Sequence, residues 1–192
     1  MTKRVKILDT ALLSDSWAQL SKISFEYLRS DGQWQHQERE VYNRGDGAAI
    51  LLYNLEQRTV VLIKQFRLPV YLDDNDGFLI EVPAGVLEQN NPEQTIRSET
   101  EQETGYRVSE ICQLFSAYVS PGSITERIHY YHASYTADQR IFEGGGLDSE
   151  GEDIEVMEVA FDDAMAWITT GQIQDAKTVL LLQHAALTLF NV

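Results

Sequence analysis

The chain has 192 residues, 43% of them hydrophobic, and a formal net charge of −15. This length predicts one domain, or one domain with a small appended subdomain, and the hydrophobic share is sufficient for a packed core. The acidic balance argues against nucleic acid and anionic lipid as partners, since binding either requires Lys and Arg gathered on one face. Phosphate-bearing substrates fit such a charge only where divalent metal ions bound to carboxylates reverse its sign locally.

Membrane association and disulfide bonding are also excluded by the sequence. No apolar run reaches the roughly 18 residues of a membrane-spanning helix, and the first five residues lead into mixed polar sequence without a signal-peptide pattern. The single cysteine, Cys112, excludes an intrachain disulfide and predicts a cytoplasmic protein. Its apolar neighbours Ile111 and Leu114 predict that this thiol is buried.

The first predicted strands lie before residue 44. Apolar residues largely alternate with polar ones over residues 17–28, which is typical of a strand. A Ser-Asp-Gly turn follows at residues 30–32, and residues 34–42 are predicted to form the returning strand. These segments predict an N-terminal β-subdomain over residues 1–44, with the main domain over residues 45–192.

The main domain is predicted to begin with strands. The apolar, β-branched runs at residues 48–53 and 60–66 predict a buried hairpin. Residues 72–77 are expected to form an acidic loop, and the short strand that follows, through Ile80 and Val82, is expected to break at Pro83.

A central helix is predicted to begin at Pro92 and to end before Gly105. Asn91 is a favoured N-cap, Pro is favoured at the first helical position, and Gly is favoured as the C-cap. Positions four apart lie on one helical face, so Glu99 and Glu103 are expected to project side by side.

Strands, a glycine-rich loop and two helices complete the predicted fold. The strands are expected at residues 108–118, 128–135 and 154–161, and the helices at residues 162–170 and 176–190. The segment from Glu143 to Gly151 is rich in glycine and is expected to lack regular structure. The sum is a mixed α/β or α+β domain, and of the two we expect an α+β fold.

The paired glutamates of the central helix allow two interpretations. Carboxylates four positions apart repel each other unless a cation lies between them, and Mg²⁺ takes oxygen ligands of this kind. Taken alone, however, the helix is explained more simply by a solvated acidic face. The residues that precede the helix change this balance.

The loop and helix together resemble the signature of the Nudix hydrolases, a glycine followed by a helix with the pattern Arg-Glu-x-x-Glu-Glu-x-Gly. The matching residues are Gly85 and residues 98–105. Residues 81–85 (Glu-Val-Pro-Ala-Gly) are similar to the nucleoside-diphosphate-sugar branch, and Pro121 is placed as in ADP-ribose pyrophosphatases. The likeness covers nearly the whole chain and is strongest to the GDP-mannose pyrophosphatase group, with further matches at residues 44–48, 64–67, 144–146 and 175–179.

Two positions depart from this signature. Ser98 stands where Arg is usual, and Gln102 replaces the first Glu of the Glu-Glu pair. An amide offers only a neutral oxygen. We therefore expect an ion held by Glu99 and Glu103 to be retained, and any ion that relies on position 102 to bind more weakly.

The resemblance implies a Nudix α/β/α sandwich with a small N-terminal β-subdomain. It also implies that the backbone carbonyl of Ala84 joins Glu99 and Glu103 as a metal ligand, with Mg²⁺ as the cofactor and Mn²⁺ as a substitute. The implied reaction is hydrolysis of GDP-mannose to GMP and mannose 1-phosphate, with ADP-ribose hydrolysis to AMP and ribose 5-phosphate as the alternative. Because of Gln102, a catalytically weak protein that binds a nucleotide sugar is a third interpretation.

By the same resemblance, the group that activates water comes from the acidic loop at residues 148–154. Alignment on its Glu-Asp-Ile ending suggests Glu150 as the base and Glu152 as a further metal ligand. Either residue could be catalytic, because mobile loops often carry such closing steps. The competing interpretation is a disordered acidic turn.

Four residues are candidates for substrate binding. Arg67 follows a strand and could clamp a phosphate through its planar donor fork, with a surface arginine at a strand end as the less favoured alternative. Lys177 opens the last helix and could reach the phosphates or the sugar, or it could be a solvated helix-end lysine. Trp17 and Arg39 belong to the N-terminal subdomain, which in this family is exchanged within a homodimer. Trp17 could therefore stack on the base, although core packing is the simpler expectation for it.

Overall fold

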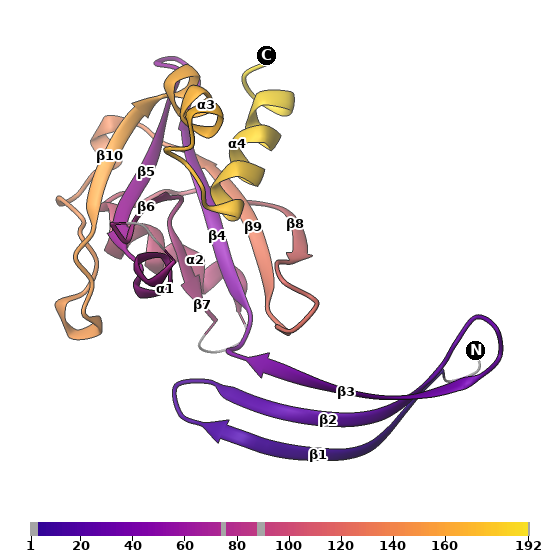
Figure 1. The fold of residues 1–192 in the computed structure, drawn as a ribbon. Helices are drawn as coiled ribbons and strands as arrows, with labels where there is room; N and C mark the ends of the chain where they lie inside the picture. Colours follow the sequence, from indigo (N-terminus) through magenta and orange to yellow (C-terminus); the bar gives the residue numbers. More distant parts are fainter. Residues whose placement is uncertain (1–3, 74–75, 88–90, 192) are drawn as a thin grey trace. The chain divides into compact units, whose positions relative to one another are not determined.

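The computed structural model describes residues 4–73, 76–87 and 91–191 (Figure 1). Its contacts divide the chain into two compact units. The first comprises residues 1–46 together with residues 118–127, and the second comprises residues 47–117 and 128–192. A segment from the middle of the chain thus belongs with the N-terminal strands.

The first unit contains an antiparallel sheet of three strands in the order β1-β2-β3, with bounds Val5–Asp15, Gln19–Leu28 and Trp34–Asn43. The strands predicted on either side of the Ser-Asp-Gly turn are confirmed as β2 and β3. Strand β1 was not predicted. Every residue of β1 is exposed, and a strand with no buried face has no reason to alternate polar and apolar residues.

The second unit is built on a sheet of seven strands in the order β10-β5-β4-β9-β8, with β6 paired to β5 and β7 paired to β4. The predicted hairpin is confirmed as the antiparallel pair β4 and β5, whereas β4 and β9 run parallel. The bounds are β4 Gly47–Asn54, β5 Thr59–Phe66, β6 Phe78–Glu81, β7 Ala84–Val86, β8 Cys112–Tyr118, β9 Arg127–Ser134 and β10 Glu155–Ala160.

Helices cover both faces of this sheet. Side chains alternate along β4, so that Ala49 and Leu51 join one core cluster while Ala48, Ile50 and Leu52 join another. The first cluster contains buried residues of α3 (Phe161–Thr170) and α4 (Ala176–Thr188), and the second contains the buried Ile96 of α2 (Pro92–Thr104). A short helix, α1 (Leu68–Leu72), follows β5. The predicted α/β/α sandwich with a small N-terminal sheet is confirmed.

Helix α2 has the predicted bounds. The side chain of Asn91 accepts a hydrogen bond from the backbone N–H of Gln94 at 3.2 Å. At the other end, Gly105 takes the left-handed conformation with φ of 75°, which glycine adopts at little cost. These two caps fix the register of the helix and place Glu99 and Glu103 one turn apart.

The prediction for Cys112 is wrong, because its side chain is exposed. Cys112 is the first residue of β8, which is the last strand in the sheet order. Its apolar neighbours Ile111 and Leu114 are each partly buried, but at the end of an edge strand that burial does not extend to the thiol. Among the described residues, no helix is long and apolar enough to cross a membrane.

Candidate metal and substrate site

Glycine at position 85 allows α2 to approach strand β7 closely. A Cβ atom added to Gly85 would lie 2.0 Å from Oε1 of Glu99 and 2.3 Å from its Cδ. Gly85 lies within β7, which pairs with β4. The strand predicted to break at Pro83 is therefore followed at once by a second short strand. The absence of a side chain therefore makes room for the Glu99 carboxylate.

Glu103 is the buried member of the glutamate pair. Glu103 is only 1% exposed, and its carboxylate accepts a hydrogen bond from the backbone N–H of Ala84 at 3.0 Å. Burial and then repulsion by Glu99 raise its pKa well above the ordinary value, with a further rise from Glu152. The Ala84 hydrogen bond and Arg67 act in the opposite direction. A cation at this face would relieve the repulsion among these carboxylates.

Glu99 and Glu103 fit a divalent metal site in which substrate phosphates supply further ligands. Within the described parts of the chain, no group of three or more His, Cys, Asp or Glu side chains is gathered as a ready-made metal site. Mg²⁺, however, usually keeps several waters and binds one or two carboxylates plus substrate phosphates. Glu99 and Glu103, which repel each other beside the Ala84 backbone, match that ligand set.

The glycine-rich segment closes the end of α2. Gly145 and Gly146 donate backbone hydrogen bonds to the carbonyls of Glu103 and Gln102, at 2.9 and 3.1 Å. A Cβ atom on Gly144 would lie 2.6 Å from the Glu103 carbonyl oxygen. The expected lack of regular structure is confirmed for residues 143–147 and is wrong for residues 148–150, which form a 3-10 turn. The close contact with α2 positions the acidic loop that follows.

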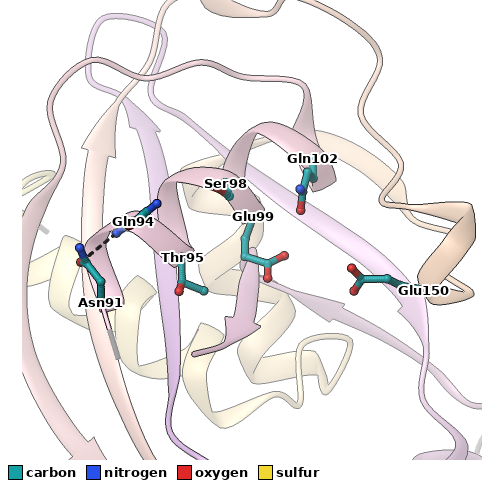
Figure 2. Close-up of a pocket in the computed structure, with 7 residues that line it drawn as sticks. All are labelled: Asn91, Gln94, Thr95, Ser98, Glu99, Gln102 and Glu150. Carbon is teal, nitrogen blue, oxygen red and sulfur yellow. Dashed lines mark hydrogen bonds between the residues drawn. The ribbon is translucent and has the colours of Figure 1, made fainter. Parts of the chain in front are cut away.

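Both acidic loop candidates lie near α2, with different neighbours. Glu150 lines a polar cleft of about 160 Å³ and points toward Glu99 (Figure 2). The carboxylate of Glu152 instead accepts the backbone N–H of Leu147 at 2.9 Å and contributes to the raised pKa of Glu103. Their roles as base and metal ligand stay predictions. The other residues that line the cleft are Asn91, Gln94, Thr95, Ser98 and Gln102.

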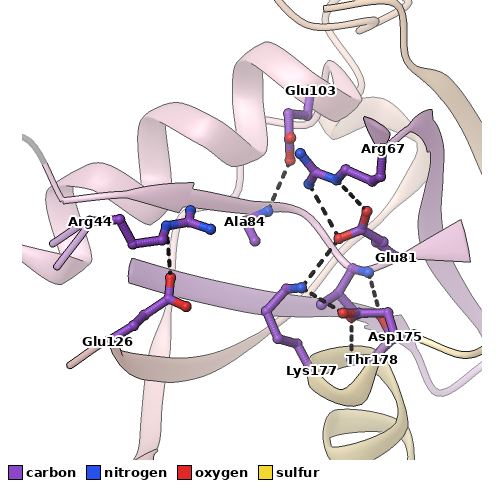
Figure 3. A network of polar contacts seen from close by, with 10 residues as sticks. Arg44, Arg67, Glu81, Ala84, Glu103, Glu126, Asp175, Lys177 and Thr178 are labelled. Carbon is purple, nitrogen blue, oxygen red and sulfur yellow. Dashed lines mark hydrogen bonds and ion pairs between the residues drawn. The ribbon is translucent and has the colours of Figure 1, made fainter. Parts of the chain in front are cut away.

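Arg67 and Lys177, predicted separately, meet on one carboxylate (Figure 3). Glu81 accepts hydrogen bonds from Nε and Nη2 of Arg67 at 2.7 and 3.3 Å, and from Nζ of Lys177 at 3.2 Å. Lys177 also donates to Asp175 at 2.6 Å. The other oxygen of Asp175 accepts the backbone N–H and the hydroxyl of Thr178.

Both cations keep their charge in this network. Burial acts to lower the pKa of Arg67, but Glu81, together with Glu103 and Asp175, more than offsets it and raises that pKa. For Lys177, burial is likewise outweighed by Asp175 and Glu81, and its pKa is raised. Because Glu103 acts on Arg67, this positive group lies within electrostatic reach of the paired glutamates.

Sequence reasoning did not identify Glu81 or Asp175 as part of the site. The signal for Glu81 was a single acid that ends the apolar run of residues 78–80, since acids are rarely buried without a partner. For Asp175, the signal was its place before the last helix, where its side chain is the N-cap of α4.

The N-terminal candidates lie in the first unit. Trp17 is 74% exposed, so the expected core packing is wrong. Its ring contacts the guanidinium of Arg44 at 5.3 Å from the ring centroid. Arg39 is exposed and donates to the backbone carbonyl of Glu38 at 2.7 Å. Their assignment to substrate stays a prediction.

A substitution at Gly85 tests the close approach of α2 to β7. Gly85→Ala is expected to displace the Glu99 carboxylate and to weaken Mg²⁺ binding by about 10- to 100-fold, the range found when the supports of metal ligands are lost. Isothermal titration calorimetry with Mg²⁺ measures this. Gly122→Ala is the matched control, since nothing lies within 4 Å of a Cβ atom there. Equal Mg²⁺ affinity in both variants would contradict the placement of Glu99.

Known protein families match both parts of the chain. A family model described as the GDP-mannose pyrophosphatase NudK N-terminal domain matches residues 4–42, and one described as the NUDIX domain matches residues 43–184. A GDP-mannose pyrophosphatase of Pectobacterium atrosepticum is 48% identical over 186 residues, which cover 96% of this chain and 95% of the relative. GDP-mannose pyrophosphatases of Escherichia coli O139:H28 and Shigella sonnei are 47% identical over 185 residues, 96% of each chain.

Proposed function

The chain belongs to the NUDIX family, and we propose that this pyrophosphohydrolase cleaves GDP-mannose to GMP and mannose 1-phosphate. Relatives at 47–48% identity over 96% of the chain carry the name GDP-mannose pyrophosphatase, which supports this substrate. The observation that carries the proposal is the buried Glu103 carboxylate, which lies beside the Ala84 backbone and is repelled by Glu99.

Nudix hydrolases generally use divalent metal ions, and we propose Mg²⁺ as the cofactor, with Mn²⁺ as a substitute. Glu99, Glu103 and the carbonyl of Ala84 would hold the metal, and Glu152 would be a further ligand. A divalent cation supplies positive charge that offsets the diphosphate and polarises its phosphorus. Gln102 contributes only a neutral oxygen, so the charge of the site depends on the glutamates on either side of it.

The side chains around the metal ligands have separate roles in the proposed reaction. Arg67 and Lys177 bind the phosphate oxygens through N–H groups and balance their charge. Glu150 accepts a proton from the attacking water as the water oxygen bonds to phosphorus and the bridging P–O bond breaks. The exposed cleft position of Glu150, opposite Glu99, supports this role (Figure 2).

We also propose a homodimer, in which the subdomain at residues 1–44 contacts the substrate bound to residues 45–192 of the partner. Exposed apolar side chains on one strand are typical of an interaction surface, and Ile7, Leu8, Leu12 and Leu13 of β1 are all about half exposed or more. Trp17 would stack on the base and Arg39 would contact the nucleotide. A cytoplasmic location is proposed from the single cysteine.

A panel of nucleotide sugars tests the reaction and the substrate together. GDP-mannose, GDP-glucose, ADP-ribose and UDP-glucose are incubated with the protein and Mg²⁺, and products are identified by ³¹P NMR and anion-exchange chromatography. The expected result is GMP and mannose 1-phosphate, with the highest kcat/KM for GDP-mannose. A higher kcat/KM for ADP-ribose would replace the substrate assignment. Tight binding with no turnover in Mg²⁺ or Mn²⁺ would contradict the enzymatic function.

A further inference from the structure

A buried carboxylate lies behind the two cations assigned to the substrate. Glu81 ends strand β6 and is 2% exposed, yet it is outside the proposed set of metal ligands. Burying an acid is costly unless cations and hydrogen bonds compensate for lost water. Here Arg67 and Lys177 provide that compensation. The geometry of the three groups indicates how Glu81 in turn orients the two cations.

Glu81 occupies one edge of the Arg67 guanidinium, and within the described parts of the chain no hydrogen bond occupies the other edge. An arginine has five N–H groups in a rigid plane. Glu81 accepts from Nε and Nη2, on one edge of that plane, through its two carboxylate oxygens. The two N–H groups of Nη1 and the second of Nη2 point away from this edge. Since the side chain of Arg67 is 40% exposed and that of Glu81 only 2%, the free edge is the one that a ligand can reach.

Lys177 is fixed in a similar way. Two of its three N–H groups are directed to Glu81 and Asp175, and among the residues that the structure describes none accepts from the third, which can therefore meet a ligand. Asp175 is itself held by Thr178, whose hydroxyl accepts the backbone N–H of Val82 at 2.8 Å. The start of α4 is therefore tied to the end of β6, so the lysine and Glu81 are held on a common frame.

The four charged groups also balance one another. Glu81 and Asp175 carry two negative charges, and Arg67 and Lys177 carry two positive ones, joined by the hydrogen bonds of Figure 3. In a chain of net charge −15, this pairing keeps two cations oriented and charged, and one of them, Arg67, lies within electrostatic reach of Glu103 on α2. Without Glu81, both side chains would regain rotamer freedom that substrate binding must remove.

We propose that Glu81 is a positioning residue for the substrate, which orients Arg67 and Lys177 so that their remaining N–H groups meet the diphosphate. The inference rests on the proposed function, since the diphosphate is that of a nucleoside-diphosphate sugar. Glu81 acts through the two cations and does not itself contact the substrate.

Calorimetric binding of GDP in the presence of Mg²⁺ tests this role without turnover. Glu81→Gln is expected to weaken GDP binding by about 10- to 100-fold, as is usual for a lost supporting partner, and to raise the KM for GDP-mannose by a similar factor. In an Arg67→Ala background, the same substitution is expected to weaken GDP binding by a smaller factor, because coupled residues are not additive and only the effect through Lys177 remains. Glu81→Asp, which keeps the charge, is expected to recover part of the affinity.

Glu101→Gln is the matched control. It also removes a carboxylate that accepts two hydrogen bonds from one arginine, Arg107, at 2.9 and 2.8 Å. We expect GDP affinity to stay within about 2-fold of that of the unchanged protein, since surface ion pairs contribute little. Mg²⁺ affinity, measured separately in Glu81→Gln, is expected to be retained, which distinguishes an effect on the cations from damage to the metal site.

Two results would overturn the proposal: unchanged GDP affinity in Glu81→Gln, or effects of Glu81→Gln and Arg67→Ala that add in full. If Glu81→Gln does not fold, Asp175→Asn makes the same test at Lys177. Weaker GDP binding that does not add to the effect of Lys177→Ala is then expected, and full additivity contradicts the role. If the proposed function itself is wrong, the protein without substitutions neither cleaves GDP-mannose nor binds GDP. That result is distinct from the two that overturn the role of Glu81.

Discussion

Glu103→Gln is expected to lower kcat for GDP-mannose hydrolysis by about 1,000-fold and to raise the melting temperature of the metal-free protein. The loss of activity follows from the loss of a charged metal ligand. A metal ion contributes several kcal/mol to stabilising charge in the transition state, and each 1.36 kcal/mol is a factor of ten in rate. The gain in stability follows from the burial of Glu103 and its repulsion by Glu99.

The pKa of Glu103 is raised in the folded protein above its ordinary value of 4.5, first by burial and then by Glu99. The folded state therefore favours the protonated form. This contribution to stability is fully present below the unfolded pKa and is lost as pH rises through the folded pKa. Glutamine stays neutral, so Glu103→Gln should not show this loss.

Thermal unfolding at several pH values between 4 and 8, with EDTA or with Mg²⁺, measures both effects. Mg²⁺ should stabilise the unchanged protein most at high pH, where it binds the ionised carboxylate, because a ligand stabilises the state that it binds. It should add little stability to Glu103→Gln. Glu101→Gln, on the same helix, should behave like the unchanged protein. Two results contradict the assignment of Glu103 as a metal ligand: full activity in Glu103→Gln, or a pH dependence of stability in Glu103→Gln that is identical to that of the protein without substitutions.

The acidic loop should give two distinguishable defects. Glu150→Gln is expected to lower kcat by about 10²- to 10⁴-fold at saturating Mg²⁺, the usual contribution of a general base. Glu152→Gln is expected mainly to raise the Mg²⁺ concentration needed for half-maximal rate, because its carboxylate acts electrostatically on Glu103. Initial rates over a range of Mg²⁺ concentrations for the two variants separate these effects.

The pH dependence of kcat provides a second comparison. If Glu150 is the base, the acidic limb of the profile should disappear in Glu150→Gln and persist in Glu152→Gln. The reverse pattern would exchange the two roles. Normal kcat and normal Mg²⁺ dependence in both variants would remove the acidic loop from the mechanism. Asp153→Asn, in the same loop, serves as the control for a general change in loop charge.

Local signals in the sequence were sufficient for much of the second unit. The caps Asn91 and Gly105 determine the ends of α2, and helical periodicity then places Glu99 beside Glu103. The hairpin of β4 and β5 followed from two apolar runs separated by a turn. Strand β1 had no such signal, because its apolar side chains are exposed and do not mark a buried face.

The cation network shows what sequence spacing could not provide. Glu81 lies 14 positions from Arg67 and 96 positions from Lys177, and nothing in those separations indicates contact. Only the folded sheet brings β6 against the start of α4. The exposure of Trp17 has a different reason: the strand predicted over residues 17–28 begins only at Gln19, so Trp17 lies in the bend between β1 and β2 and not on a strand face.

Anomalous diffraction from crystals grown with Mn²⁺ and GDP tests the central claim most directly, namely that the acidic face of α2 is the metal site. Mn²⁺ prefers the same oxygen ligands as Mg²⁺, and its anomalous signal identifies the ion. We predict a peak in contact with the carboxylates of Glu99 and Glu103 and with the carbonyl of Ala84. Mn²⁺ bound elsewhere, with the Glu99 and Glu103 carboxylates in contact with water alone, would contradict the claim.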